Sequence, residues 1–379
     1  MRGSVARGAI ALTVAALALA ASPRVAGAAP RDTETISGRW LLDFRSTGSV
    51  ELTLQRRSAS GSDHWSSSDD FAPGDFQGLA RPTSSADAPS SFRLERDAGT
   101  IRFEGHLNDA GGSGGFTFQP NAEYLAAIAK MGYPSPTAEE TFSLAVHDVS
   151  RAFLRDLAAL GYQHVELDDL VSMRIHGASP QFIRDLKALG YDHLSVEDLV
   201  SMRIHGASPQ FIRDLKTLGY GHLSVEDLVS MRIHGASPDF IRSMQAAGYR
   251  NLSAEDLVSM RIHGVTPEFI QAMKGLGHLD ADELVSLRIH GATPEFVREM
   301  ESLGYRDLDA DDVVSMRIHG VTPEFVRDIQ ALGYRNVSAD DLVSMRIHGV
   351  SVDDVKRMKA RNKDVSIDEV VDMKIHGRG

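Results

Sequence analysis

Apolar positions follow two different periods along this chain of 379 residues. Between residues 36 and 120 they alternate with polar positions, as in the run Phe92-Arg93-Leu94-Glu95. A period of two predicts strands with one buried face. From about Asn121 onward the spacing lengthens to three and four residues, which predicts short amphipathic helices. We therefore expect an α+β protein in which a strand-rich part precedes a helical part.

The strand-rich part, residues 36–120, contains clear turn signals. Gly38–Phe44 and Val50–Arg56 are typical of one hairpin, and Asp97-Ala98-Gly99 marks a tight turn. The run from Asn108 to Gly115 predicts a Gly-rich loop. We expect six or seven antiparallel strands here, arranged as a small barrel or sandwich.

A strong internal repeat fills the helical part, residues 121–379. Residues 171–199 and 200–228 agree at 27 of 29 positions, and an Ile-His-Gly element recurs at spacings of 29, 29, 29, 27, 29, 29 and 28. Self-similarity at a fixed period indicates an α-solenoid, here of two-helix repeats of about 29 residues. We expect about nine units with a degenerate first and last copy; the last replaces Leu-Gly-Tyr by Lys359–Lys363.

One unit can be interpreted residue by residue. Ser195 is a predicted N-cap, Gly206 a predicted C-terminal glycine, and Ser208-Pro209 the predicted start of a second helix. Helices of about ten residues are not stable alone, so neighbouring units must supply the missing burial. The apolar stripe of the first helix is expected to contain Val196, Leu199, Val200 and Ile204.

Two polar residues recur once per unit, and we expect both to be structural. The Arg is expected to pair with an acid at the start of the next unit, and the His to lie at a helix C-terminus, where a cation is favoured. Equivalent His residues in stacked units lie about 10 Å apart, too far to share one metal ion. The residues are Arg174, Arg203, Arg232, Arg261, Arg288, Arg317 and Arg346, with His176, His205, His234, His263, His290, His319, His348 and His376.

Charge and composition reduce the number of functions that the chain could have. The formal net charge is −12, and removing the first 28 residues, which carry three Arg and no acid, leaves −15. Such a chain repels phosphate backbones, which argues against nucleic acid as a partner. There is no cysteine, so disulfides, thiol catalysis and thiolate zinc sites are excluded.

Residues 1–28 have the features of a signal peptide. Arg2 and Arg7 form a basic start, Ala9–Ala21 is an apolar run, and Ala26-Gly27-Ala28 offers small residues for cleavage. The apolar run is short for a membrane span, and no later segment is long and apolar enough for one. We expect a periplasmic or secreted protein with a cleaved signal, or alternatively one that keeps the segment as an anchor.

No catalytic constellation is recognisable. His64, Ser66 and Asp69 are close in sequence, but on a predicted strand or loop we interpret this as a chance cluster. Gly111–Gly115 is followed by another predicted strand and not by a helix, which argues against a phosphate cradle. We expect no catalytic residue, no cofactor and no metal site, and therefore no enzyme.

The repeat itself resembles a known group. Units of the form Leu-Val-Ser-Met-Arg-Ile-His-Gly-Val-Thr-Pro-Glu-Phe, as at residues 257–269, are similar to repeats of bacterial envelope proteins, including the C-terminal extensions of antibiotic-sensor membrane peptidases of the BlaR1 type. The resemblance covers residues 140–377 only, and the chain has neither the multi-span part nor the zinc-peptidase motif. The resemblance implies an envelope context and a signalling neighbour, and the peptidase activity does not carry over because those two parts are missing.

The sequence leaves two functions open. The first is an exported, non-catalytic binding or scaffold protein whose helical-repeat surface meets a protein partner in the cell envelope. The alternative is an envelope sensor or regulatory accessory whose β domain binds a small ligand. A row of exposed apolar side chains along the array favours the first, and a ligand cavity between the β faces favours the second.

Overall fold

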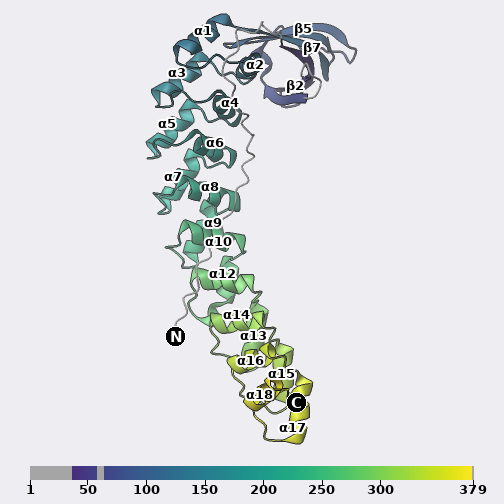
Figure 1. The fold of residues 1–379 in the computed structure, drawn as a ribbon, viewed down its shortest axis with the longest axis vertical. Helices are drawn as coiled ribbons and strands as arrows, with labels where there is room; N and C mark the ends of the chain where they lie inside the picture. Colours follow the sequence, from purple (N-terminus) through teal and green to yellow (C-terminus); the bar gives the residue numbers. More distant parts are fainter. Residues whose placement is uncertain (1–35, 58–63, 378–379) are drawn as a thin grey trace. The chain divides into compact units, whose positions relative to one another are not determined.

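The computed structural model describes residues 36–57 and 64–377, so the predicted signal peptide, residues 1–28, lies outside the described residues. The chain divides into two compact units. Of the described residues, the first unit contains 36–57, 64–95, Thr100–Pro120 and Thr137–Glu139, and the second contains Arg96–Gly99, Asn121–Pro136 and 140–377. The α+β class is confirmed: a curled antiparallel sheet precedes a series of short helices (Figure 1).

The β unit is built from one seven-stranded sheet that curls into a half-barrel. Its strand order is β3-β2-β1-β7-β6-β5-β4, so the first strand pairs with the last and two meanders run outward from that pair. The predicted hairpin is confirmed, with Leu42 opposite Leu52 in the antiparallel register of β1 and β2. The strands are β1 (Ile36–Phe44), β2 (Val50–Arg57), β3 (His64–Phe71), β4 (Phe76–Gln77), β5 (Ala88–Arg96), β6 (Gly99–Leu107) and β7 (Gly111–Pro120).

Aromatic side chains fill the inner face of this sheet. The Phe92 and Phe103 rings stack with centroids 4.7 Å apart, and Trp40 meets Phe92 edge-on at 5.2 Å. Phe76 contacts both phenylalanines. These rings are at most 5% exposed, so the alternating residues that predicted the strands supply a packed aromatic core.

The predicted Gly-rich loop at Asn108–Gly115 is confirmed only for residues 108–110, because Gly111 already begins strand β7. The glycines are needed for close approach between strands. A Cβ at Gly114 would lie 2.0 Å from the Glu104 carbonyl oxygen, and one at Gly105 would lie 2.8 Å from the Trp40 ring. Glycine therefore marks contact between backbones here, and no turn.

Helices follow one another through the rest of the described chain. Each unit contributes a first helix, which carries an even number from α4 onward, and a second helix with an odd number. The helices are α1 (Ala122–Lys130), α2 (Ala138–Val146), α3 (Arg151–Ala159), α4 (Leu167–His176), α5 (Pro180–Ala188), α6 (Val196–Ile204), α7 (Pro209–Thr217), α8 (Val225–His234), α9 (Pro238–Ala246), α10 (Ala254–Ile262), α11 (Pro267–Ala272), α12 (Ala281–Ile289), α13 (Pro294–Ser302), α14 (Ala310–Ile318), α15 (Pro323–Ala331), α16 (Ala339–Ile347), α17 (Val352–Arg361) and α18 (Ile367–Ile375).

The helices stack in two layers. Each even-numbered helix from α4 to α16 packs on the next even-numbered helix, while odd-numbered helices such as α5 and α7 pack on one another (Figure 1). Inside one unit the core consists of Leu199, Met202, Phe211, Ile212 and Leu215, all 5% exposed or less. None of the helices in the described part of the chain is long and apolar enough to cross a membrane.

Local capping chemistry sets the helix boundaries as predicted. The Ser195 hydroxyl accepts from the Asp198 amide at 2.9 Å, and the Asp198 carboxylate accepts in return from the Ser195 amide. Gly206 adopts a φ of +71°, the left-handed conformation that turns the chain out of the first helix. Ser208 then caps α7, with Pro209 in its first turn. The sequence of each unit therefore determines locally where its two helices begin and end, while stacking on neighbouring units stabilises them.

One unit departs from the regular geometry. Helix α11 has six residues, and a 3-10 turn at Lys274–Leu276 completes it. This is the unit whose period is shortened to 27 residues and whose loop lacks the usual Tyr. The His278 ring stacks on Tyr249 there with centroids 6.0 Å apart.

Candidate interaction surface

The Ile of every Ile-His-Gly element is exposed, which contradicts the prediction that Ile204 belongs to the core stripe. On a helical wheel Ile204 lies about 140–160° around from the buried Leu199 and Met202, on the outward side of α6. Eight equivalent side chains form what we call the Ile row: Ile175 53%, Ile204 54%, Ile233 49%, Ile262 48%, Ile289 54%, Ile318 54%, Ile347 55% and Ile375 53% exposed.

A second row runs beside the first. Glu197 precedes Ile204 by seven residues, which places the two side chains about 20° apart on the wheel and about 10.5 Å apart along α6. Within the described residues, none of the eight equivalent carboxylates forms a hydrogen bond or an ion pair, and all are exposed. This acid row consists of Asp168, Glu197, Glu226, Glu255, Asp282, Asp311, Asp340 and Asp368. The two rows together are what we call the outward face of the even-numbered helices from α4 to α18.

The sequence predicted that the repeated Arg pairs with an acid at the start of the next unit. This prediction is wrong for the described residues, where Arg203 has other partners. The Arg203 guanidinium lies 5.2 Å from the ring centroid of Phe182, and its Nε donates to the His176 carbonyl oxygen at 3.1 Å. Both partners belong to the preceding unit. A planar guanidinium can lie over a ring and still donate in its own plane to a carbonyl oxygen. The same Arg–Phe geometry, with separations from 4.9 to 5.3 Å, recurs at Arg174, Arg203, Arg232, Arg261, Arg288, Arg317 and Arg346.

The repeated His lies where the sequence placed it, at the C-terminal end of each first helix. His205 is the C-cap of α6, and His176 is the last residue of α4. The ring of His348 bonds the Ser344 carbonyl oxygen of its own helix at 2.8 Å. Within residues 36–57 and 64–377, no three His, Asp or Glu side chains gather in a group that could hold a metal ion.

The second helices are linked by a similar set of contacts. Lys216 Nζ donates to the Leu189 carbonyl oxygen at 2.6 Å, across one unit, and Gln245 does the same to Leu218 at 3.1 Å. The Tyr220 hydroxyl points the other way and donates to the Leu252 carbonyl oxygen of the following unit at 2.9 Å. Each unit thus satisfies backbone carbonyls that its neighbour leaves open at helix ends and loops.

The last unit exchanges both members of the Arg–Phe pair. Asp354 occupies the Phe position and Lys374 the Arg position, and Lys374 Nζ donates to Asp354 Oδ2 at 2.8 Å. Asp354 is 4% exposed and also binds Arg357 and the Ser351 cap. The hydrogen bond from Lys374, with those from Ser351, holds the pKa of Asp354 well below its usual range. A salt bridge therefore replaces a cation–π contact at an equivalent position.

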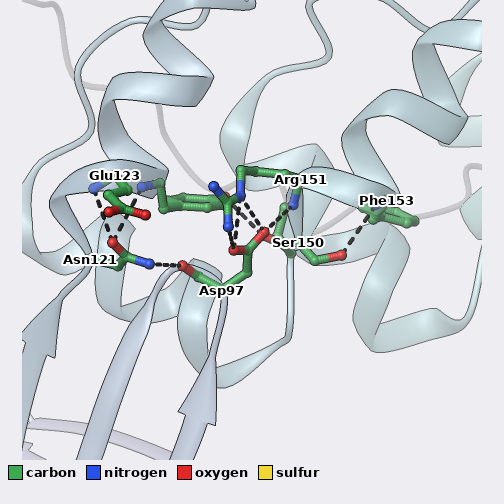
Figure 2. Close-up of polar contacts among 8 residues, drawn as sticks. Asp97, Asn121, Glu123, Ser150, Arg151 and Phe153 are labelled. Atoms are coloured by element: carbon green, nitrogen blue, oxygen red, sulfur yellow. Dashed lines mark hydrogen bonds and ion pairs between the residues drawn. The ribbon is translucent and has the colours of Figure 1, made fainter.

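Asp97 organises the start of the helical unit (Figure 2). Its carboxylate accepts from the Arg151 amide at 2.7 Å and from Arg151 Nε at 2.9 Å, while Ser150 caps the same helix through the Phe153 amide. Burial raises the pKa of Asp97, but its hydrogen bonds and charge contact with Arg151 outweigh burial and lower the pKa overall. The Asn121 side chain, the cap of α1, donates to the Asp97 carbonyl oxygen at 3.0 Å. A carboxylate so fully bonded acts as a structural clamp.

Two other features, a surface depression and a polar cluster on β3, are weaker candidates for a functional site. An open depression of about 640 Å³ lies between two loops, where Gly221 stands at the position that Asp192 holds one unit earlier. Its walls mix charges of both signs, including Arg250 and Glu255. His64, Ser66 and Asp69 lie on β3, where an odd spacing puts Asp69 on the opposite face from the other two. The outward face is therefore the leading candidate.

Comparison with known proteins did not identify a family or a relative. No model of a known protein family matches the chain, and a search of curated proteins finds no match either. The similarity of the repeats to those of BlaR1-type peptidases stays a prediction. The outward face is therefore the feature of the molecule from which a function can be inferred.

Proposed function

We propose that this is an exported, non-catalytic binding or scaffold protein that presents its helical array to a protein partner in the cell envelope. The observation that carries the proposal is the Ile row, with eight side chains between 48% and 55% exposed. A single exposed Ile on a protein surface is ordinary. Exposure that recurs at the same position of successive units gives a regularly spaced row of apolar side chains, and exposed apolar surface of this extent is typical of interaction sites.

The other repeated side chains support the same interpretation, because they are already engaged within the array. Arg203, Lys216 and Tyr220 each bind a carbonyl oxygen of a neighbouring unit. These contacts link neighbouring units along the array. An extended surface is what repeat arrays offer to long partners.

The alternative, a sensor whose β domain binds a small ligand, has weaker support. Trp40, Phe76, Phe92 and Phe103 contact one another across the inner face of the sheet. Stacked aromatic rings occupy the volume that a ligand would need. The export part of the proposal is supported by the basic start and the apolar run of residues 1–28.

An affinity comparison tests this proposal. The purified chain and a variant with all eight Ile of the row changed to Ser serve as baits for envelope extract. We expect proteins that the unchanged chain captures and the Ser variant does not, while circular dichroism shows the same helix content for both. Equal capture by both baits would refute the assignment of binding to the Ile row.

A further inference from the structure

The outward face carries a pattern more specific than exposed apolar surface. Along each even-numbered helix from α4 to α18, a carboxylate with no partner among the described residues lies near the N-terminal end and an exposed Ile near the C-terminal end, as with Glu197 and Ile204 of α6. Stacking repeats this pair at the spacing of packed helices, about 8–10 Å. The face is therefore a strip with one acidic edge and one apolar edge.

Charge complementarity selects the occupant of this strip. The repeated Arg is directed away from the acid row. Arg203 and its six equivalents all lie over a Phe ring of the preceding unit, and Arg203 also donates to a backbone carbonyl oxygen there. In the described structure the nearest regular source of positive charge is thus already engaged, and the acid row remains available to cations from outside. A partner that buries the Ile row must present apolar groups there and basic groups about 10.5 Å away.

An amphipathic helix has these dimensions. Its diameter with side chains is about 10–12 Å, so it can touch both edges of the strip at once. Positions seven residues apart in such a helix advance about 10.5 Å, close to the spacing of the layers, whereas same-face positions of a β-strand advance about 6.6 or 13 Å. A helix that lies along the array can therefore meet one Ile per heptad.

We propose that the outward face binds a basic amphipathic helix of a partner protein, with apolar side chains on the Ile row and Lys or Arg side chains on the acid row. This inference rests on the proposed binding function and specifies the chemistry of the partner. It also fits the net charge of the chain, since an acidic array attracts basic segments over long distances.

The test uses a designed probe on the full chain. The probe is a fluorescent helical peptide of four heptads with Leu on one side and Lys along the adjacent flank, and a matched peptide carries Glu in place of Lys. Three variants are compared. The first changes the eight Ile of the row to Ser, and the second changes the eight carboxylates of the acid row to their amides. The third is a matched control that changes to amides eight exposed acids elsewhere for which no ion pair is found among the described residues: Asp70, Glu123, Asp156, Glu268, Asp307, Glu324, Asp328 and Asp364.

We expect the Lys peptide to bind the unchanged chain and the Glu peptide not to bind. Affinity should fall at least about tenfold in the Ile-row and acid-row variants and less than about threefold in the matched control. Higher salt should weaken binding, since exposed charges are screened. If the eight-site Ser variant does not fold, a version changed at alternate units replaces it, with a smaller loss expected.

Three results would overturn the inference. Equal weakening in the acid-row and control variants would mean that net charge alone attracts the peptide. Unchanged affinity in the Ile-row variant would remove the apolar contact. Sedimentation of the chain alone as a dimer that the Ser changes dissociate would make a second copy the occupant. The proposed binding function survives all three if capture from envelope extract still depends on the Ile row.

Discussion

The contact between Arg203 and Phe182 offers a direct test of how neighbouring units hold together. The guanidinium lies over the ring at 5.2 Å and donates to the His176 carbonyl oxygen at 3.1 Å. We consider Arg203→Met, which keeps an apolar stem, and Phe182→Leu, which keeps apolar volume but removes the ring face. Together they form a double-mutant cycle for the stacking contact alone.

The magnitude follows from exposure. Arg203 is exposed, so the cation–π contact is worth about 0.5–1 kcal/mol and the hydrogen bond to His176 about 1 kcal/mol. Arg203→Met should therefore cost about 1.5–2 kcal/mol, and Arg203→Ala about 1 kcal/mol more because the stem packing is lost as well. The cycle with Phe182→Leu should give a coupling energy of about 0.5–1 kcal/mol.

Urea unfolding followed by far-ultraviolet circular dichroism measures these differences, analysed with nearest-neighbour terms because repeat arrays unfold unit by unit. A second cycle, between Arg203 and Asp227, serves as the control and should give less than about 0.3 kcal/mol. A coupling larger for Asp227 than for Phe182 would refute the reasoning and return the acid to the role that the sequence suggested.

Three further predictions concern other links in the array. Tyr220→Phe leaves the Leu252 carbonyl oxygen without its donor and should lower the free energy of unfolding by about 1 kcal/mol in urea titration; no change would show that water replaces the hydroxyl. Gly206→Ala forces a Cβ into a φ of +71° and should cost about 1 kcal/mol in the same assay, more than an Ala at the exposed helical position Glu197. The lowered pKa of Asp354 means that the last unit should be most stable above about pH 4 and should lose this stabilisation as pH falls toward the folded pKa. Hydrogen exchange of residues 352–375, corrected for intrinsic rates, measures this loss. The loss should be smaller in Lys374→Met than in the unchanged chain.

The helix boundaries could be predicted because their causes are local. Ser195, Gly206 and Ser208 each act within a few residues, through a cap or a left-handed turn. The strands of the β unit were predictable for a similar reason, since alternation shows which face is buried. The Gly-rich run was misassigned because glycine also serves close strand contact, as at Gly114.

The outward face could not be identified from a single unit. Helix α6 has two apolar stripes, one with Leu199 and Met202 and another with Val200 and Ile204, and either could face a core. The packing of neighbouring units determines which of the two stripes is buried, and a single unit does not contain that information. The Arg partner was missed although a signal existed: in most units a Phe lies 21 residues before the Arg.

The contacts between units also have a direction, and this bears on how the array changes length. Regular units reach back with Arg, several of them also with Lys or Gln, and forward with Tyr, so a regular unit provides contacts to its neighbours on both sides. Residues 171–199 and 200–228, alike at 27 of 29 positions, have the character of a recent duplication. An inserted copy joins the stack without new interface residues and extends the outward face by one Ile and one carboxylate. For a partner that lies along several units, each duplication would add avidity in one genetic step.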